Sequence, residues 1–224
     1  MTELENPTII INLKGYEESL GANALVMARD CQEITEESGV LFAVCPPTVE
    51  LGVIARSVDI PVIAQNADPK HFGPTTGWVT PASIKTAGGV ATLINHAEHR
   101  VSNAVVGKTV GVCNSVPLES IVCAETPEMA RAFASFEPTF VAVEPPELIG
   151  GDVSVTRNPQ VIERTVEGVH AVDPNIGVIC GAGIKTGLDV ANALELGTCG
   201  VLVASGFVKA EDRKAALREL IKHI

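Results

Sequence analysis

Eight short, uninterrupted apolar runs recur along the chain, and the segments between them have the apolar spacing and start signals of helices. Runs of this kind, without alternating polar residues, are typical of parallel strands that are covered on both faces. The chain is 46% hydrophobic but only 4% aromatic, so the core of such a sheet must be aliphatic. The predicted strands are Thr8–Leu13, Val40–Cys45, Val62–Ala64, Val90–Ile94, Ser120–Cys123, Phe140–Val143, Gly177–Cys180 and Gly200–Ala204.

The regular alternation of strand and helix is itself the internal repeat of this sequence. A length of 224 residues without a break in composition fits one α/β barrel. We therefore expect residues 1–224 to form a single domain, a (β/α)8 TIM barrel with eight parallel strands. The C-terminal ends of those strands would converge on one face, where barrels of this kind build their active sites.

Several predicted helices have clear start signals. Three begin with a capping residue and a first-turn proline, at Thr80-Pro81, Thr126-Pro127 and Asn158-Pro159. Thr186 and Asp189 resemble a capping box, with Asp in place of the usual Glu. The stretch 101–118 is interrupted by two glycines and Pro117, so we expect a short or irregular helix there. The last predicted helix places four apolar residues on one side, Leu217, Leu220, Ile221 and Ile224.

Composition and charge exclude several classes of function. A net charge of −11 argues against nucleic acid as a partner, because phosphate contacts need clustered Lys and Arg. No apolar run approaches the length of a membrane span, and the N-terminus lacks the pattern of a signal peptide. None of the six cysteines lies in a Cys-x-x-Cys pair, so we expect reduced thiols in a cytoplasmic protein and no zinc site.

Polar side chains suited to proton transfer follow three of the predicted strands. Asn12 and Lys14 end the first strand, His96 and Glu98 follow the fourth, and Glu144 follows the sixth. Alternation places Asn12 and Lys14 on the side that faces the barrel axis. Lys14 could neutralise a phosphate or an enolate oxygen and pair with Glu98, and His96 could hydrogen-bond a substrate oxygen. This combination on one barrel face indicates proton transfer next to a carbonyl.

Each of these residues has a plainer interpretation when it is taken alone. Lys14 could be a solvated lysine after a strand, and His96 a surface or capping histidine. The segment Pro145–Asp152, after Glu144, has prolines at its entry, apolar residues in the middle and glycines near its exit. That composition favours a lid that moves as a unit, and the alternative is an ordinary βα-loop.

Two glycine-containing tripeptides follow the seventh and eighth predicted strands, Gly181-Ala-Gly183 and Ala204-Ser-Gly206. Glycine lets backbone N–H groups approach a phosphate closely. In α/β barrels the loops after these two strands commonly form a phosphate site. Each tripeptide alone is weak support, but their position after these two strands favours a phosphate-bearing substrate.

Taken together, the motifs resemble those of the triosephosphate isomerases, specifically the short archaeal type, from Ile10 to Ile224. The matching motifs are Asn12-Leu-Lys14, Cys45-Pro-Pro47, Thr76-Gly77, Asn95-His96-x-Glu98, Glu144-Pro-Pro-Glu-Leu-Ile-Gly150, Cys180-Gly-Ala-Gly183 and Ala204-Ser-Gly206. The sequence departs from the family pattern in two places. The usual lid ending Ile-Gly-Thr-Gly reads Ile149-Gly150-Gly151-Asp152 here, and Trp78 follows Gly77 where a polar residue is common.

The resemblance implies a cytoplasmic enzyme of glycolysis and gluconeogenesis that interconverts dihydroxyacetone phosphate and D-glyceraldehyde 3-phosphate without a metal or cofactor. Glu144 would be the catalytic base, and His96 would polarise the carbonyl. Lys14 would stabilise the enediolate, with Asn12 beside it and Glu98 in support. The residues implied in substrate binding are Asn12, Leu13, Lys14, Ile149, Gly150, Gly183, Ala204 and Ser205.

Two other functions fit a barrel with a phosphate site. One is another phosphate-binding barrel enzyme, acting for example on an indole or thiazole substrate, and the pairs at Asn12–Lys14 and His96–Glu98 argue against it. The other is a catalytically silent barrel that binds a phosphosugar. An intact set of Lys14, His96 and Glu144 argues against that alternative.

The predicted loop 65–78 is long for a βα-loop and carries Phe72, Thr75, Thr76 and Trp78. Exposed apolar groups on a long loop indicate a partner surface. We therefore expect a homo-oligomer, and the resemblance favours a homotetramer over a homodimer. The alternative is a loop folded over its own barrel.

Overall fold

The strands of the fold follow the apolar runs closely. A computed structural model describes residues 4, 7–148, 151 and 154–224. Predicted and observed strands differ by at most one residue at either end. The strands are β1 (Thr8–Asn12), β2 (Leu41–Cys45), β3 (Ile63–Ala64), β4 (Ala91–Ile94), β5 (Glu119–Ala124), β6 (Phe140–Val143), β7 (Gly177–Gly181) and β8 (Gly200–Val203).

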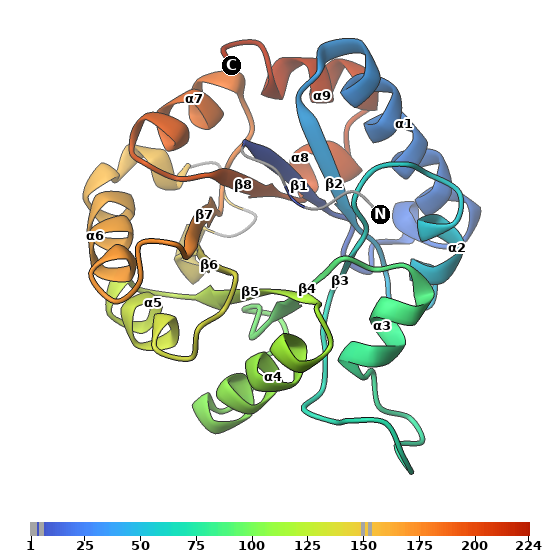
Figure 1. The fold of residues 1–224 in the computed structure, drawn as a ribbon. Helices are drawn as coiled ribbons and strands as arrows, with labels where there is room; N and C mark the ends of the chain where they lie inside the picture. Colours follow the sequence, from blue (N-terminus) through green and yellow to red (C-terminus); the bar gives the residue numbers. More distant parts are fainter. Residues whose placement is uncertain (1–3, 5–6, 149–150, 152–153) are drawn as a thin grey trace.

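Helices connect each strand to the next and surround the sheet (Figure 1). The α-helices are α1 (Ala22–Ser38), α2 (Leu51–Ala55), α3 (Pro81–Ala87), α4 (Asn103–Ser115), α5 (Pro127–Ala134), α6 (Pro159–His170), α7 (Gly187–Glu195), α8 (Ser205–Val208) and α9 (Arg213–Leu220). Short 3-10 helices are η1 (Glu17–Ser19), η2 (Pro146–Leu148) and η3 (Val155–Arg157).

The strands form one parallel sheet in the order β2-β1-β8-β7-β6-β5-β4-β3. The first and last strands are neighbours, with Thr8 opposite Gly200 and Ile11 opposite Val203. A parallel bridge between Val44 and Val62 brings the two ends of this order together. The predicted (β/α)8 barrel is therefore confirmed.

Side chains of successive strand residues point alternately into the barrel and out toward the helices. In β1, Ile10 packs in the inner cluster with Ile63 and Leu202, whereas Ile9 and Ile11 belong to the outer cluster under the helices. All three isoleucines are fully buried, because the strand is covered on both faces. The alternation places Asn12 on the inner side, as predicted.

Most helix start signals are confirmed. The side chains of Thr80 and Thr126 accept hydrogen bonds from the third residue of their helices, and Thr186 and Asp189 form a complete capping box. Asn158 precedes α6 but makes no side-chain cap. The last helix ends at Leu220, so Ile224 lies beyond it and is 46% exposed, contrary to the predicted shared face.

The expectation of a short or irregular helix over 101–118 is wrong. Helix α4 is a regular α-helix of 13 residues. Val106, Val110 and Cys113 are buried on one face, and this packing outweighs the helix-breaking tendency of the glycines. Gly107 also has a packing role, because a Cβ there would lie 3.1 Å from the Phe136 ring.

Ion pairs join α1 to α9, the first and last of the α-helices, which lie side by side (Figure 1). Arg213 Nε lies 2.9 Å from Asp30 Oδ2, and Lys214 Nζ lies 2.6 Å from Glu33 Oε1. One turn further along, Arg218 pairs with Glu37. These pairs hold together the two helices at which the chain closes the barrel.

All six cysteines are free thiols, and burial raises the pKa of Cys113 and Cys180 to about 12. Among the residues that the structure describes, no helix is both long and apolar enough to cross a membrane.

Candidate active site

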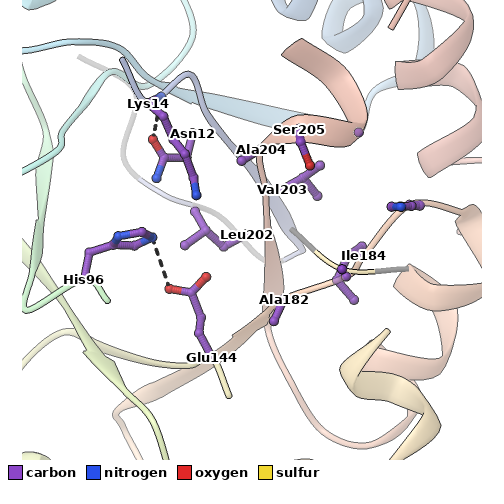
Figure 2. A pocket seen from close by; sticks show the side chains of 14 residues that line it. Asn12, Lys14, His96, Glu144, Ala182, Ile184, Leu202, Val203, Ala204 and Ser205 are labelled. Carbon is purple, nitrogen blue, oxygen red and sulfur yellow. Dashed lines mark hydrogen bonds and ion pairs between the residues drawn. The ribbon is translucent and has the colours of Figure 1, made fainter. Parts of the chain in front are cut away.

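A cavity that is partly open to solvent lies at the C-terminal ends of the strands. Its walls come from the segments after β1, β4, β6, β7 and β8, which converge there because the strands are parallel (Figure 2). The lining residues are Asn12, Lys14, His96, Glu144, Gly151, Ala182, Gly183, Ile184, Lys185, Leu202, Val203, Ala204, Ser205 and Gly206.

Asn12 and Lys14 stand at the end of β1. The Asn12 Oδ1 atom accepts a hydrogen bond from the Lys14 backbone N–H at 3.0 Å (Figure 2). Lys14 has a φ of 51°, a left-handed conformation that non-glycine residues seldom adopt. Its ammonium reaches Glu98 Oε1 at 2.7 Å, so the pairing expected from the sequence is present.

His96 is buried and enters the cavity from the end of β4. Its Nδ1 atom accepts a hydrogen bond from the Glu98 backbone N–H at 3.2 Å. Burial lowers the pKa of His96, and the positive charge of Lys14 lowers it further. A neutral imidazole that accepts at Nδ1 carries its proton on Nε2, and Nε2 faces the cavity near Glu144.

Glu144 follows β6 and is almost fully buried. Burial raises its pKa to about 7, although the Lys14 charge and a hydrogen bond from the Cys123 thiol act in the opposite direction. The Glu144 Oε2 atom lies 3.7 Å from His96 Nε2, too far for a hydrogen bond (Figure 2). Within the described part of the chain it has no hydrogen-bond partner. The site therefore holds a buried carboxylate oxygen that a ligand could engage.

The end of the cavity opposite His96 is lined by the segments that follow β7 and β8. Ala182 and Gly183 have φ values of 75° and 71°, so the chain turns tightly after β7. Ala204 and Ser205 line the same end, where β8 passes into α8. Such turns expose backbone N–H groups to anions.

Comparisons with known proteins show which family the chain belongs to. A family model described as triosephosphate isomerase matches residues 7–224. The chain belongs to the triosephosphate isomerase family. It is 46% identical to the triosephosphate isomerase of Methanothermus fervidus over 219 residues, which cover 97% of this chain and 99% of the relative. The triosephosphate isomerase of Methanocaldococcus jannaschii is 44% identical over 217 residues, covering 96% and 99% of the two chains. The predicted resemblance to archaeal members of the family is therefore confirmed.

Most residues that the family resemblance singled out line this one cavity. They are Asn12, Lys14, His96, Glu144, Gly183, Ala204 and Ser205. Leu13 is different, because its side chain is fully buried in the outer core cluster and lies away from the cavity. Ile149 and Gly150, and with them Asp152 of the predicted lid, lie outside the described residues.

Sequence reasoning missed several residues around Glu144. The thiol of Cys123 bonds its carboxylate, and Leu202 lines the cavity floor. Both are inward positions of β5 and β8, so counting the alternation along those strands could have found them. Gly181 leaves room for the carboxylate, because a Cβ there would lie 2.6 Å from Glu144 Oε1. No sequence signal identified that contact.

Groups of three or more His, Cys, Asp or Glu side chains suited to a metal ion are absent from the described residues. The absence of a cofactor requirement stays a prediction.

Proposed function

We propose that this member of the triosephosphate isomerase family interconverts dihydroxyacetone phosphate and D-glyceraldehyde 3-phosphate by proton transfer through an enediolate. The observation that carries the proposal is the placement of Glu144, His96 and Lys14 around one cavity. The family match over residues 7–224 supports it. The chemistry requires only a base, an electrophile and an anion site, so no cofactor is invoked.

Glu144 is assigned as the base that removes the proton from the carbon beside the carbonyl. A general base works best when its pKa lies near the operating pH, and burial raises the Glu144 pKa to about 7. The carboxylate oxygen that lacks a partner among the described residues is the one near His96 Nε2. A substrate carbon bound beside Oε2 would therefore lose its proton to a poorly solvated carboxylate.

His96 is assigned as the electrophile. Its Nε2–H would donate to the carbonyl oxygen and hold the negative charge that develops there. The Glu98 N–H fixes the ring by bonding Nδ1 at 3.2 Å, so the donor is oriented before substrate arrives. The ammonium of Lys14, held by Glu98, would stabilise the enediolate and attract the phosphate, with Asn12 beside it.

The phosphate is assigned to the end of the cavity opposite His96, at Gly183, Ala204 and Ser205. The tight turn after β7 supports this assignment, since backbone N–H groups in such turns suit an anion. We also propose Ile149 and Gly150, by family resemblance, as phosphate-binding residues. These assignments imply that inorganic phosphate competes with the substrate.

A coupled assay with dihydroxyacetone phosphate separates this function from the two alternatives. We expect turnover in the wild-type protein and none in Glu144→Gln. Inorganic phosphate should still inhibit the wild-type protein and bind the variant. A silent phosphosugar-binding barrel would bind phosphate without turnover in the wild-type protein. A different barrel enzyme would give neither turnover nor competition by the triose phosphate.

We further propose that residues 1–224 act as one domain within a homo-oligomer, with a homotetramer favoured over a homodimer by resemblance. The loop between β3 and α3 extends beyond the ring of helices, and its Phe72 is 80% exposed (Figure 1). Trp78 in the same loop is 49% exposed, and Val49 after β2 is 83% exposed. Apolar groups this exposed are typical of interfaces.

Light scattering at micromolar concentration tests the assembly. We expect a multiple of the 23.4 kDa chain mass, and Phe72→Ser should shift the protein toward smaller species. A wild-type monomer would refute the proposal. A cytoplasmic location and a role in glycolysis and gluconeogenesis follow from the proposed reaction and belong to the same proposal.

A further inference from the structure

A glutamine outside the proposed catalytic set ties together three strand ends next to Lys14. Gln65 directly follows β3 and is half-buried. Its Nε2 atom lies 2.9 Å from the Lys14 carbonyl oxygen and 3.2 Å from the Cys45 carbonyl oxygen, with Asn12 Oδ1 at 3.4 Å. One amide thus connects the C-terminal ends of β1, β2 and β3.

The contacts of Gln65 fix which way two amides point. Three oxygen acceptors surround the Gln65 amide nitrogen, so the opposite orientation would place its own oxygen against them. Asn12 Oδ1 accepts from both the Lys14 N–H and Gln65. The Asn12 Nδ2 group is therefore the part of that amide left for the cavity, which Asn12 lines.

Lys14 needs this support because of its backbone. Its φ of 51° is a conformation that a residue with a Cβ keeps only when its surroundings hold it. Asn12 holds its N–H, Gln65 holds its carbonyl, and Glu98 holds its ammonium. Of these three, only Gln65 bonds the Lys14 carbonyl oxygen in the structure described.

We propose that Gln65 is a positioning residue for the isomerisation. It acts through Lys14, by holding that residue in its left-handed backbone conformation after β1. This inference rests on the proposed function. Displacing a charged group by about 1 Å can cost on the order of 100-fold in rate. Gln65→Met, which keeps the length but removes the donor, should therefore lower kcat/KM by about 10- to 100-fold.

A double-mutant cycle with Lys14→Ala distinguishes positioning from general stabilisation. If Gln65 acts through Lys14, then Gln65→Met should change kcat/KM by less than about twofold when Lys14 is already alanine. An equal loss in both backgrounds would assign Gln65 a merely structural role and overturn the inference. Wild-type kinetics in Gln65→Met would do the same. An inactive wild-type protein would instead refute the proposed function, and the inference with it.

Gln65→Glu provides a second readout that does not need the weak Lys14→Ala enzyme. The carboxylate of this variant would face the same three acceptor oxygens, so it could donate a hydrogen bond only when protonated. The ratio of its kcat/KM to that of wild type should rise about threefold or more between pH 8 and pH 5, because a glutamate with an ordinary pKa of about 4.3 is about one-sixth protonated at pH 5. Lys14, His96, Glu98 and His99 line a second cavity together with Gln65, and dividing by the wild-type value removes contributions that both enzymes share. Gln160→Glu, on the exposed start of α6, is the matched control and should give a flat ratio. A flat ratio for Gln65→Glu would contradict the inference.

Discussion

Replacing Glu144 by glutamine should abolish turnover and, at neutral and alkaline pH, stabilise the fold. The carboxyl is buried, and its pKa is raised from 4.5 to about 7. Between pH 4.5 and pH 7, the Glu144 carboxyl is therefore mostly protonated in the folded protein and mostly ionised in the unfolded chain. Stability consequently falls as the pH rises through that window, and the full penalty applies above it. Glutamine keeps the shape and removes the charge.

The size of the effect follows from the pKa change. One pKa unit corresponds to about 1.4 kcal/mol, so the ionised carboxylate costs about 3 kcal/mol at pH 8. Glu144→Gln should be more stable than wild type by about that amount at pH 8, and by less than about 0.5 kcal/mol at pH 4.5. Turnover should fall by at least about 100-fold, because an amide cannot act as a general base.

Urea unfolding of both proteins at pH 8 and pH 4.5, at equal protomer concentration, measures this difference. Glu163→Gln is a suitable control, because Glu163 is exposed on α6 and should give little change at either pH. A stability difference for Glu144→Gln that does not depend on pH would refute the argument from burial. A variant that retains half of the wild-type turnover would refute the assignment of Glu144 as the base.

Three further changes, one of them with a matched control, test other parts of the structure. His96→Asn should lower kcat by about 100- to 1,000-fold and change KM much less, because the imidazole acts on charge that develops in the transition state; steady-state kinetics showing the loss in KM alone would make His96 a binding group only. Lys14→Ala should impair both kcat and KM, with partial rescue by a small amine in the assay. Wild-type kinetics in this variant would exclude a catalytic role for the residues at the end of β1. Asp30→Asn should destabilise the protein by about 1 kcal/mol in urea unfolding, because it breaks the half-buried pair with Arg213; Glu37→Gln, whose pair with Arg218 is about half-exposed, should have less effect, and the reverse order would contradict the role given to the α1–α9 contact.

Much of the fold could be predicted because its strands are buried on both faces. That burial requires continuous apolar runs, which are visible without any tertiary information. Helix α4 could not be predicted in the same way. Gly107 and Gly111 lower its intrinsic helix propensity, and the decisive contribution is the packing of Val106, Val110 and Cys113 against the barrel.

The sequence by itself determined which chemical groups meet. Parallel strands bring their C-terminal ends to one face, so Lys14, His96 and Glu144 had to converge once the eight strands were recognised. The tertiary structure alone decided their states. The raised pKa of Glu144, the neutral His96 with its proton on Nε2, and the Gln65 amide beside Lys14 depend on burial and on contacts between residues far apart in the chain. Such contacts leave no local pattern, because desolvation and hydrogen bonding are properties of the packed environment and not of the residue type.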